Sequence, residues 1–241
     1  MDNELWVHPD WLRQDGLPDS DDDDNDQGPS LNYLDMDVIN DWVVKLTFEK
    51  VINNRIECLT GSGFFLNLPN INQHVVLTAA HNLISSGGIR TLNLKVIYNN
   101  PFQIDPNNPD KVIFADDKKP AIIEIPVDNT DQSDNIHICS NYYMGTLWNY
   151  AAICIPRTTS EDSRGFGFSL KFAHKKSFNG NVHVSGFKGT MMKTLRPFTC
   201  MASDMTYRKQ CFAYQAETEA GMSGSPVWVE YKGYPTVVAV Q

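Results

Sequence analysis

The sequence predicts an all-β protein made of many short strands. Runs rich in Val, Ile, Phe and Tyr recur from about residue 34 onward, at lengths typical of strands. Turn-forming stretches such as "NLPNINQ", "FNGN" and "YKGYP" separate them. No segment has the apolar spacing of an amphipathic helix of three turns. These observations predict that the 241-residue chain folds as a β sandwich or as β barrels.

The expected strands are apolar or alternating runs bounded by turn residues. In chain order they are residues 42–48, 61–68, 74–79, 92–98, 121–127, 150–155, 182–187, 210–215, 226–231 and 236–240. The polar stretch "PRTTSEDSRG" interrupts this series. We therefore expect a first β half at residues 34–155, a connecting segment at 156–165 and a second β half at 166–241.

Residues 1–33 are expected to form an acidic, disordered N-terminal tail. Residues 1–30 contain ten Asp and Glu against the single Arg13, whereas acids and bases balance in the rest of the chain. The whole excess charge of −9 therefore lies in the tail, where an Asp-rich run repels itself. Trp6 and Trp11 leave open a second reading, a short interaction segment. The neutral remainder offers no basic field for nucleic acid, so no nucleic-acid partner is expected.

The cysteines indicate reduced thiols and exclude common Cys motifs. Their number is odd, and none has the CxxC spacing of a zinc ribbon or a thioredoxin-type site. They are Cys58, Cys139, Cys154, Cys200 and Cys211. The N-terminus lacks the pattern of a secretory signal, and no apolar run approaches the ~18 residues of a membrane span. We expect a cytoplasmic protein without a membrane partner.

Four histidines of the β region do not indicate a metal site. They are scattered, without an HExxH or paired-ligand spacing. They are His74, His137, His174 and His183, apart from the one in the tail. No phosphate-binding or dinucleotide-binding glycine pattern is present either. Neither a metal nor a cofactor is expected.

The stretch "VLTAAHNL" ends in a histidine that has two readings. An apolar strand, two small residues and His81 form a junction at which a side chain can leave the sheet. A lone histidine at such a junction is most often a hydrogen-bonded structural residue. It becomes a candidate general base only when a nucleophile elsewhere in the chain needs one.

The stretch "EAGMSGSPVW" supplies such a nucleophile. Ser223 lies in a glycine-rich turn that exposes its hydroxyl, and Pro226 begins the next strand where its missing N–H costs little. The backbone N–H groups of Gly221 and Ser223 are candidates for an oxyanion hole. The simpler reading is a plain Gly/Ser turn between strands.

Taken together, with His81 before Ser223, the two motifs resemble the chymotrypsin-like serine protease family. The resemblance extends from about Val43 to Gln241. It implies two antiparallel β barrels with the site in the cleft between them, His81 as general base and Ser223 as nucleophile. The motifs "GNVHVSGFKG" and "GMSGSPVW" resemble the V8, or glutamyl-endopeptidase, branch most closely.

Two departures concern how such an enzyme becomes active. Met222 precedes the nucleophile where pancreatic zymogens have an Asp, and Asn82 follows the histidine where a Cys is usual. Activation by a freed N-terminus is therefore not supported.

The third member of the catalytic triad is altered. The family's Asp begins a strand, and in the matching segment "LWNYAAICI" its position is held by Asn149. The same exchange in another enzyme of this fold lowers turnover by about 10⁴, because the amide holds the wrong imidazole tautomer. Asp131 or Asp134, upstream of the strand, are alternative carboxylates for this role.

The resemblance also implies substrate-binding residues. Thr218 matches a pocket residue of glutamyl endopeptidases, but their partner histidine is replaced by Gln241. Glu217 lies six residues before Ser223, where trypsin has its pocket Asp. A carboxylate there would favour Lys or Arg in the substrate.

Two function classes follow from these residues. One is a serine endopeptidase that hydrolyses protein or peptide substrates through an acyl-enzyme on Ser223, weakened by Asn149. The other is a catalytically impaired pseudoprotease that binds peptides or a partner. Gln241 falls in mid-strand by the family pattern, so the second barrel is expected to be incomplete and further domains to follow residue 241.

Overall fold

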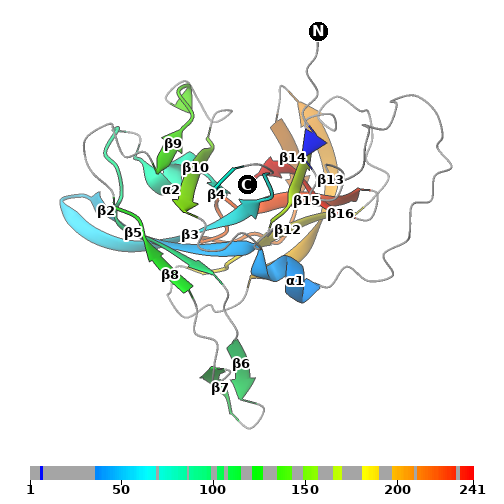
Figure 1. Ribbon diagram of the computed structural model, residues 1–241, viewed down its shortest axis with the longest axis horizontal. Helices are drawn as coiled ribbons and strands as arrows, with labels where there is room; N and C mark the ends of the chain where they lie inside the picture. Colours follow the sequence, from blue (N-terminus) through cyan, green and yellow to red (C-terminus); the bar gives the residue numbers. More distant parts are fainter. Residues whose placement is uncertain are drawn as a thin grey trace, which may run out of the picture.

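The computed structural model is an all-β molecule, as the sequence predicts. Its described residues form two seven-stranded sheets, a two-stranded hairpin and two short helices. It describes residues 6–7, 36–68, 71–85, 87–98, 102–105, 108–114, 121–126, 135–142, 149–156, 165–169, 181–189, 197–208, 211–231 and 234–241. The two sheets lie side by side (Figure 1).

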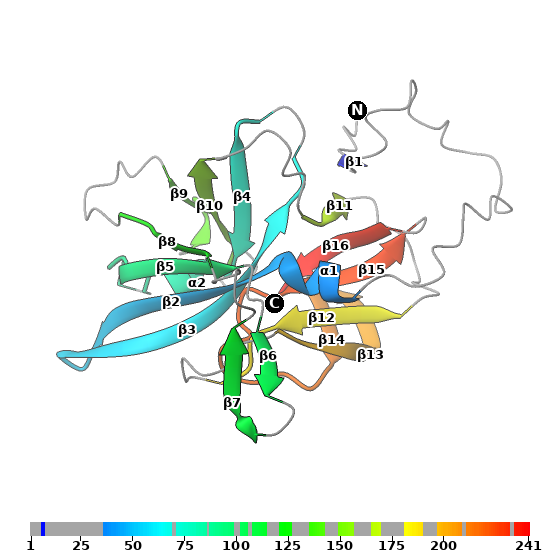
Figure 2. The same cartoon turned by 60° about the horizontal axis from the view of Figure 1, so that its bottom comes forward.

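The first sheet is antiparallel throughout, with the order β8-β5-β2-β3-β4-β10-β9. Its strands are β2 (Val43–Ile52), β3 (Arg55–Leu66), β4 (Gln73–Thr78), β5 (Leu92–Tyr98), β8 (Ala121–Glu124), β9 (Ile136–Ile138) and β10 (Ala151–Pro156). A one-turn helix, α2 (Ala80–Leu83), follows β4 directly. The hairpin of β6 (Phe102–Asp105) and β7 (Asn108–Phe114) projects away from both sheets (Figures 1 and 2).

The second sheet has the order β1-β11-β16-β15-β12-β13-β14. Its strands are β1 (Trp6–Val7), β11 (Gly167–Ser169), β12 (Val182–Gly186), β13 (Phe198–Arg208), β14 (Cys211–Gln215), β15 (Pro226–Tyr231) and β16 (Tyr234–Val240). Only β11 and β16 run parallel; the other neighbours are antiparallel. Helix α1 (Met36–Asp41) precedes β2 and lies near the second sheet in both views (Figures 1 and 2).

Every strand that the sequence predicts is a strand in the structure. The first sheet ends at Pro156, and the second sheet, apart from β1, begins at Gly167. Residues 157–164, most of the expected connecting segment, lie outside the described residues. In the tail the structure describes only Trp6–Val7 before residue 33, and these two residues pair with β11.

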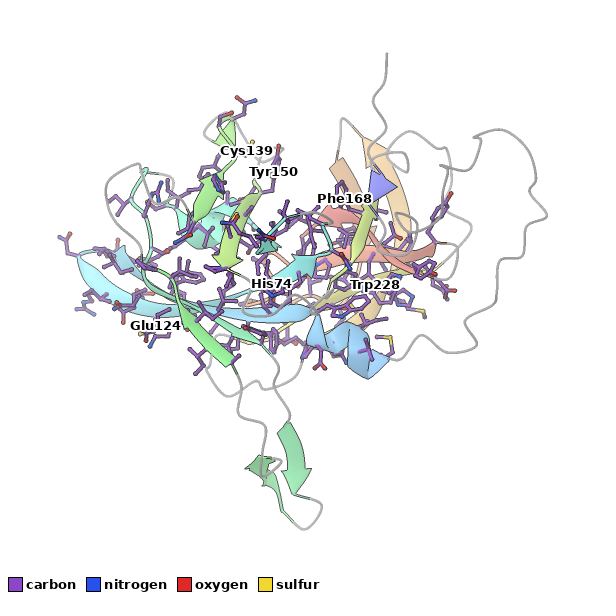
Figure 3. All side chains as sticks on the ribbon, in the orientation of Figure 1. His74, Glu124, Cys139, Tyr150, Phe168 and Trp228 are labelled. Atoms are coloured by element: carbon purple, nitrogen blue, oxygen red, sulfur yellow. The ribbon has the colours of Figure 1, made fainter. Side chains whose placement is uncertain are left out.

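A shared hydrophobic cluster joins the two sheets. The first sheet contributes Val43, Phe64 and Leu66, and the second half contributes Phe166, Phe187, Trp228 and Val237. The ring of Phe166 packs edge to face against Trp42 and Phe64, with ring centroids 5.4 and 5.8 Å apart. Figure 3 labels Trp228 within this packed region. The cluster holds the two sheets together and so fixes the turns that meet between them.

Each sheet also has a core of its own. Cys154 is buried in the first sheet, as the run "YAAICI" predicts. Four cysteines, Cys58, Cys139, Cys154 and Cys200, are free thiols; the side chain of Cys211 is outside the described part. Among the described residues no helix has the length and apolar character to cross a bilayer.

Candidate active site

The register of the first sheet brings Asn149 beside His81. Strand β4 ends at Thr78, and its partner β10 begins at Ala151, directly opposite Thr78. The residues just after β4 and just before β10 therefore lie at the same edge of the sheet. Tyr150, labelled in Figure 3 next to Cys139, marks this edge.

The amide of Asn149 makes two contacts with His81. Its Oδ1 accepts the backbone N–H of His81 at 2.9 Å, and its Nδ2 lies 2.7 Å from the imidazole Nδ1. The backbone N–H can only donate, so the amide oxygen must face it. That leaves the NH₂ group facing Nδ1.

This arrangement determines where the imidazole carries its proton. An NH₂ group donates, so Nδ1 must accept, and in the neutral ring the proton then resides on Nε2. A general base for a serine needs the opposite tautomer, with its lone pair on Nε2. An aspartate would accept from both the backbone N–H and Nδ1–H, because it has two acceptor oxygens.

The surroundings of His81 disfavour the imidazolium ion. Partial burial is the main cause that lowers the pKa of His81 below its usual 6.5, and the positive charge of Lys50 lowers it further. The Nζ of Lys50, on β2, donates a hydrogen bond to the backbone carbonyl of His81. The nearby ammonium group of Lys50 therefore opposes a positive charge on the ring.

Two backbone hydrogen bonds fix carbonyl groups of the turn that carries Ser223. The N–H of Gly189 donates to the carbonyl of Ala220 at 2.7 Å, and the N–H of Ser225 donates to the carbonyl of Met222 at 3.0 Å. In a trans peptide the N–H points opposite to the C=O. These two bonds therefore direct the N–H groups of Gly221 and Ser223 to the other side of the turn.

Neither of these N–H groups has a hydrogen-bond partner among the described residues. Gly221 is buried and has a φ of 94°, a conformation that favours glycine. A Cβ at this position would lie 2.6 Å from the carbonyl oxygen of Gly189. The two N–H groups that the sequence offers as candidate oxyanion donors are thus without a partner among the described residues, and their peptide orientation is fixed.

Two residues of the first half anchor the same turn. Ser62 donates its Oγ–H to the carbonyl of Gly221 at 2.8 Å and its N–H to the carbonyl of Ser223 at 2.9 Å. Asn82, next to His81 on α2, donates its side-chain NH₂ to the same Ser223 carbonyl at 2.8 Å and to Thr78 at 3.0 Å. The histidine helix and the serine turn are therefore in direct contact.

The imidazole of His81 and the hydroxyl of Ser223 form no hydrogen bond with each other, although both are described. Catalytic hydrogen bonds are often long before substrate binds.

Sequence reasoning did not identify Ser62, Lys50 or the role of Asn82. The available signal for Asn82 was its departure from the usual Cys. Gly61 makes room for it, since a Cβ on Gly61 would lie 2.6 Å from the Asn82 Nδ2.

The predicted substrate-binding residues occupy different surroundings. Gln241 lies against the turn: its carbonyl accepts the Gly224 N–H at 2.8 Å, and its Oε1 accepts the Tyr214 hydroxyl at 2.7 Å. Burial raises the pKa of Tyr214 to about 12. Thr218 is exposed.

Glu217 is 73% exposed and pairs with Lys188 at 2.7 Å. The preference for Lys or Arg inferred from Glu217 stays a prediction, and the carboxylate already has a cationic partner. Asp131 and Asp134 lie outside the described residues.

Within the described residues no group of His, Cys, Asp and Glu could hold a metal ion. His74 packs against Phe65, and His183 stacks on Trp228 with ring centroids 4.4 Å apart. His137 is exposed, and His174 is not among the described residues.

Comparisons with solved structures identify the fold. No protein-family model and no curated protein matches the sequence. The chain is similar to a thermostable serine protease, AL20, from an extremophilic microorganism, with 12% identity, a TM-score of 0.51 and 82% of each chain covered. It is also similar to HL collagenase, with 14% identity, a TM-score of 0.51 and coverage of 83% of this chain and 80% of that one. At these identities the likeness establishes the fold, which is the chymotrypsin-like, two-barrel, all-β fold that the resemblance implied.

Proposed function

We propose that this chain is a serine endopeptidase domain that hydrolyses peptide bonds slowly through an acyl-enzyme on Ser223. The observation that supports it most strongly is the contact between the histidine helix and the serine turn, made by Asn82 on the carbonyl of Ser223. It brings a candidate base and a candidate nucleophile, far apart in the sequence, to one place. Assignment to the V8 branch rests on the Ser-Pro pair at Ser225 and Pro226, in the motif "GMSGSPVW".

In this proposal the Ser223 hydroxyl attacks the scissile carbonyl while the Nε2 of His81 takes its proton. The N–H groups of Gly221 and Ser223 stabilise the developing oxyanion, and one such donor contributes roughly 2.7–4 kcal/mol in a related case. His81 can act as base only after its proton moves from Nε2 to Nδ1. That tautomer loses the hydrogen bond from Asn149, so turnover is slow.

The test is labelling by a fluorophosphonate, which reacts only with an activated serine. The native chain should label slowly at Ser223, and Ser223→Ala and His81→Ala should each abolish labelling. Asn149→Asp gives Nδ1–H an acceptor and should raise the rate by up to roughly 10⁴. Asn54→Asp adds the same charge at the exposed end of a hairpin and should leave the rate unchanged. An Asn149→Asp variant that labels no faster than the native chain contradicts the assignment of His81 and Asn149.

A second candidate is a pseudoprotease that binds a peptide or a partner protein. The contact between the Asn149 NH₂ group and Nδ1 favours it, because it withholds the lone pair that catalysis needs. Total absence of labelling in the native chain, with restoration in Asn149→Asp, would favour this candidate over a slow enzyme. Substrates or ligands are protein segments in both cases, and placement in the cytoplasm stays a prediction.

A further inference from the structure

Ser62, on β3, is fully buried and makes four hydrogen bonds, three of them with residues of the second half. Its N–H donates to the carbonyl of Ser223 at 2.9 Å, and its own carbonyl accepts the Thr78 hydroxyl at 2.7 Å. Its hydroxyl donates to the carbonyl of Gly221 at 2.8 Å and accepts the N–H of Phe187 at 2.8 Å. One residue of the first half therefore contacts two carbonyls of the serine turn.

The direction of each hydrogen bond at the Ser62 hydroxyl is determined by its partners. The N–H of Phe187 can only donate, so the hydroxyl oxygen accepts it, and the Gly221 carbonyl can only accept, so the hydroxyl proton points to it. A Cβ on Gly186 would lie 3.0 Å from the Ser62 hydroxyl oxygen, so the glycine leaves the space that the hydroxyl occupies. The hydroxyl is thus enclosed and has a single favourable orientation.

The Ser62 hydroxyl holds the peptide bond that follows Gly221. This glycine has a φ of 94°, and its lack of a Cβ allows wider rotation than other residues have. At the other end of the same peptide bond, the N–H of Met222 donates to the carbonyl of Glu219 at 3.1 Å, and Glu219 is itself exposed. The bond from buried Ser62 is shorter and comes from a strand, so it is the firmer of the two constraints.

The first half supplies the side-chain donors that fix this part of the turn. Among the described residues, the donors to the Gly221 and Ser223 carbonyls are Ser62 and Asn82, which both belong to the first half. The second half holds the carbonyls of Ala220 and Met222 through its own backbone. The conformation of the serine turn therefore depends on contact with β3.

We propose that Ser62 is a positioning residue, whose hydroxyl locks the peptide bond after Gly221 and so keeps the N–H groups of Gly221 and Ser223 on one side of the turn. The inference rests on the proposed protease function and adds a residue to it. Ser62 touches neither the substrate nor the reacting atoms in this assignment. It acts through the backbone that carries the candidate oxyanion donors.

The test compares Ser62→Ala with Ser185→Ala as a matched control. Ser185 is also fully buried, and its hydroxyl lies 2.8 Å from that of Thr199 and 2.9 Å from the indole nitrogen of Trp228, so its loss removes buried hydrogen bonds away from the turn. Both variants are made in the full chain carrying Asn149→Asp, where labelling should be fastest. Labelling is measured where circular dichroism shows the native signal.

Ser62→Ala should lower the rate of fluorophosphonate labelling roughly ten- to a hundredfold, because a misplacement of about 1 Å in a site can cost about 10² in rate. Ser185→Ala should leave the rate unchanged. Ser62→Cys, whose thiol is a weaker donor, should give an intermediate rate, and it replaces Ser62→Ala if that variant does not fold. An equal loss of rate in the Ser62 and Ser185 variants would show a general effect on the fold and would overturn the inference.

A second measurement does not need an activated serine. In ¹H–¹⁵N spectra, Ser62→Ala should shift and broaden the amide signals of residues 221–223, and Ser185→Ala should leave these signals in place. Unmoved signals in Ser62→Ala, or labelling as fast as in its parent, overturn the positioning role. If no chain labels, including the one with Asn149→Asp alone, the proposed protease fails, and the spectra still decide whether Ser62 holds the turn.

Discussion

The amide of Asn149 has to serve two neighbours on His81, a backbone N–H and a ring nitrogen. The backbone N–H leaves it no choice of orientation, so the ring nitrogen receives the NH₂ group. Asn149 in place of the family's Asp thus moves the proton of the His81 ring from Nδ1 to Nε2, with little change in side-chain shape. At the residue scale, the proposed protease thus keeps a candidate nucleophile and candidate oxyanion donors, and its candidate base carries the proton on the wrong nitrogen.

The first prediction is the pH dependence of labelling. Burial and Lys50 lower the pKa of His81, so its neutral form is populated to a lower pH than for an ordinary histidine. The labelling rate should rise with pH, with a midpoint below the usual 6.5, and should then stay level. Asn149→Asp should move the midpoint upward, because a carboxylate stabilises the imidazolium.

Lys50→Met should also move the midpoint upward, since it removes a cation beside the ring. Lys95→Met is the matched control on a neighbouring strand, where the lysine is partly exposed and paired with Glu124. If neither Lys50→Met nor Asn149→Asp changes the pH midpoint, a group other than His81 controls labelling.

The sequence indicated the candidate residues for the proposed chemistry and missed those that contact and position them. His81 and Ser223 lie in recognisable motifs. Asn149 directly precedes an apolar run that the sequence predicts as a strand. Ser62 and Lys50 act through contacts across 161 and 31 positions of the chain, and no local pattern reports such contacts. Their roles depend on how the two sheets are placed.

At the scale of elements, the hairpin of β2 and β3 shows how turn chemistry fixes register. Ile52 pairs with Arg55, so Asn53 and Asn54 form a two-residue loop. Both have positive φ, 51° and 60°, as a type I′ turn requires. Asparagine tolerates this conformation better than most residues, and glycine tolerates it best.

The second prediction follows from that turn. Asn54→Gly should stabilise the protein by about 0.5 kcal/mol, because Asn-Gly is the preferred pair in this turn. Glu57→Gly, in the adjoining strand, should instead cost about 0.5–1 kcal/mol. Urea unfolding measures both as midpoint shifts at constant slope. Destabilisation by Asn54→Gly would show that the turn is not of this type.

The same scale explains which strands were found from the sequence. Strands β2, β4 and β10 have apolar runs, and in β10 the buried positions follow the run. In β4 the buried positions alternate instead and include His74 and Thr78. The run "FTCMASDMTYR" of β13 is too polar to be recognised, and β9 and β11 have three residues each. Such strands form because neighbours pair with them, which propensity alone does not reveal.

At the scale of the whole molecule, the site exists only where the two sheets meet. Ser223 comes from the second half, whereas His81, Asn149 and Ser62 come from the first. The cluster around Phe166 and Trp228 holds these halves together. The resemblance to a two-barrel family predicted that the halves face each other, but the individual contacts follow from side-chain packing, which no single-chain pattern encodes.

The last prediction is that both halves unfold together. Phe166 is fully buried and touches aromatic rings from both sides, so Phe166→Ala should cost about 3–5 kcal/mol. Far-UV circular dichroism reports all the strands, and tryptophan fluorescence includes the interface through Trp42 and Trp228. In urea the two signals should give one coincident transition, and Phe166→Ala should move both midpoints equally.

Met201→Ala is the matched control, because Met201 is 63% exposed and its loss should change stability by no more than about 0.5 kcal/mol. If the fluorescence transition of Phe166→Ala came first and dichroism kept its native midpoint, the sheets would be separable units. If Ser223 still reacted with the fluorophosphonate after the fluorescence transition, the site would not require contact between the two sheets. A single transition that abolishes labelling in step with both signals is what a site assembled by the shared cluster requires.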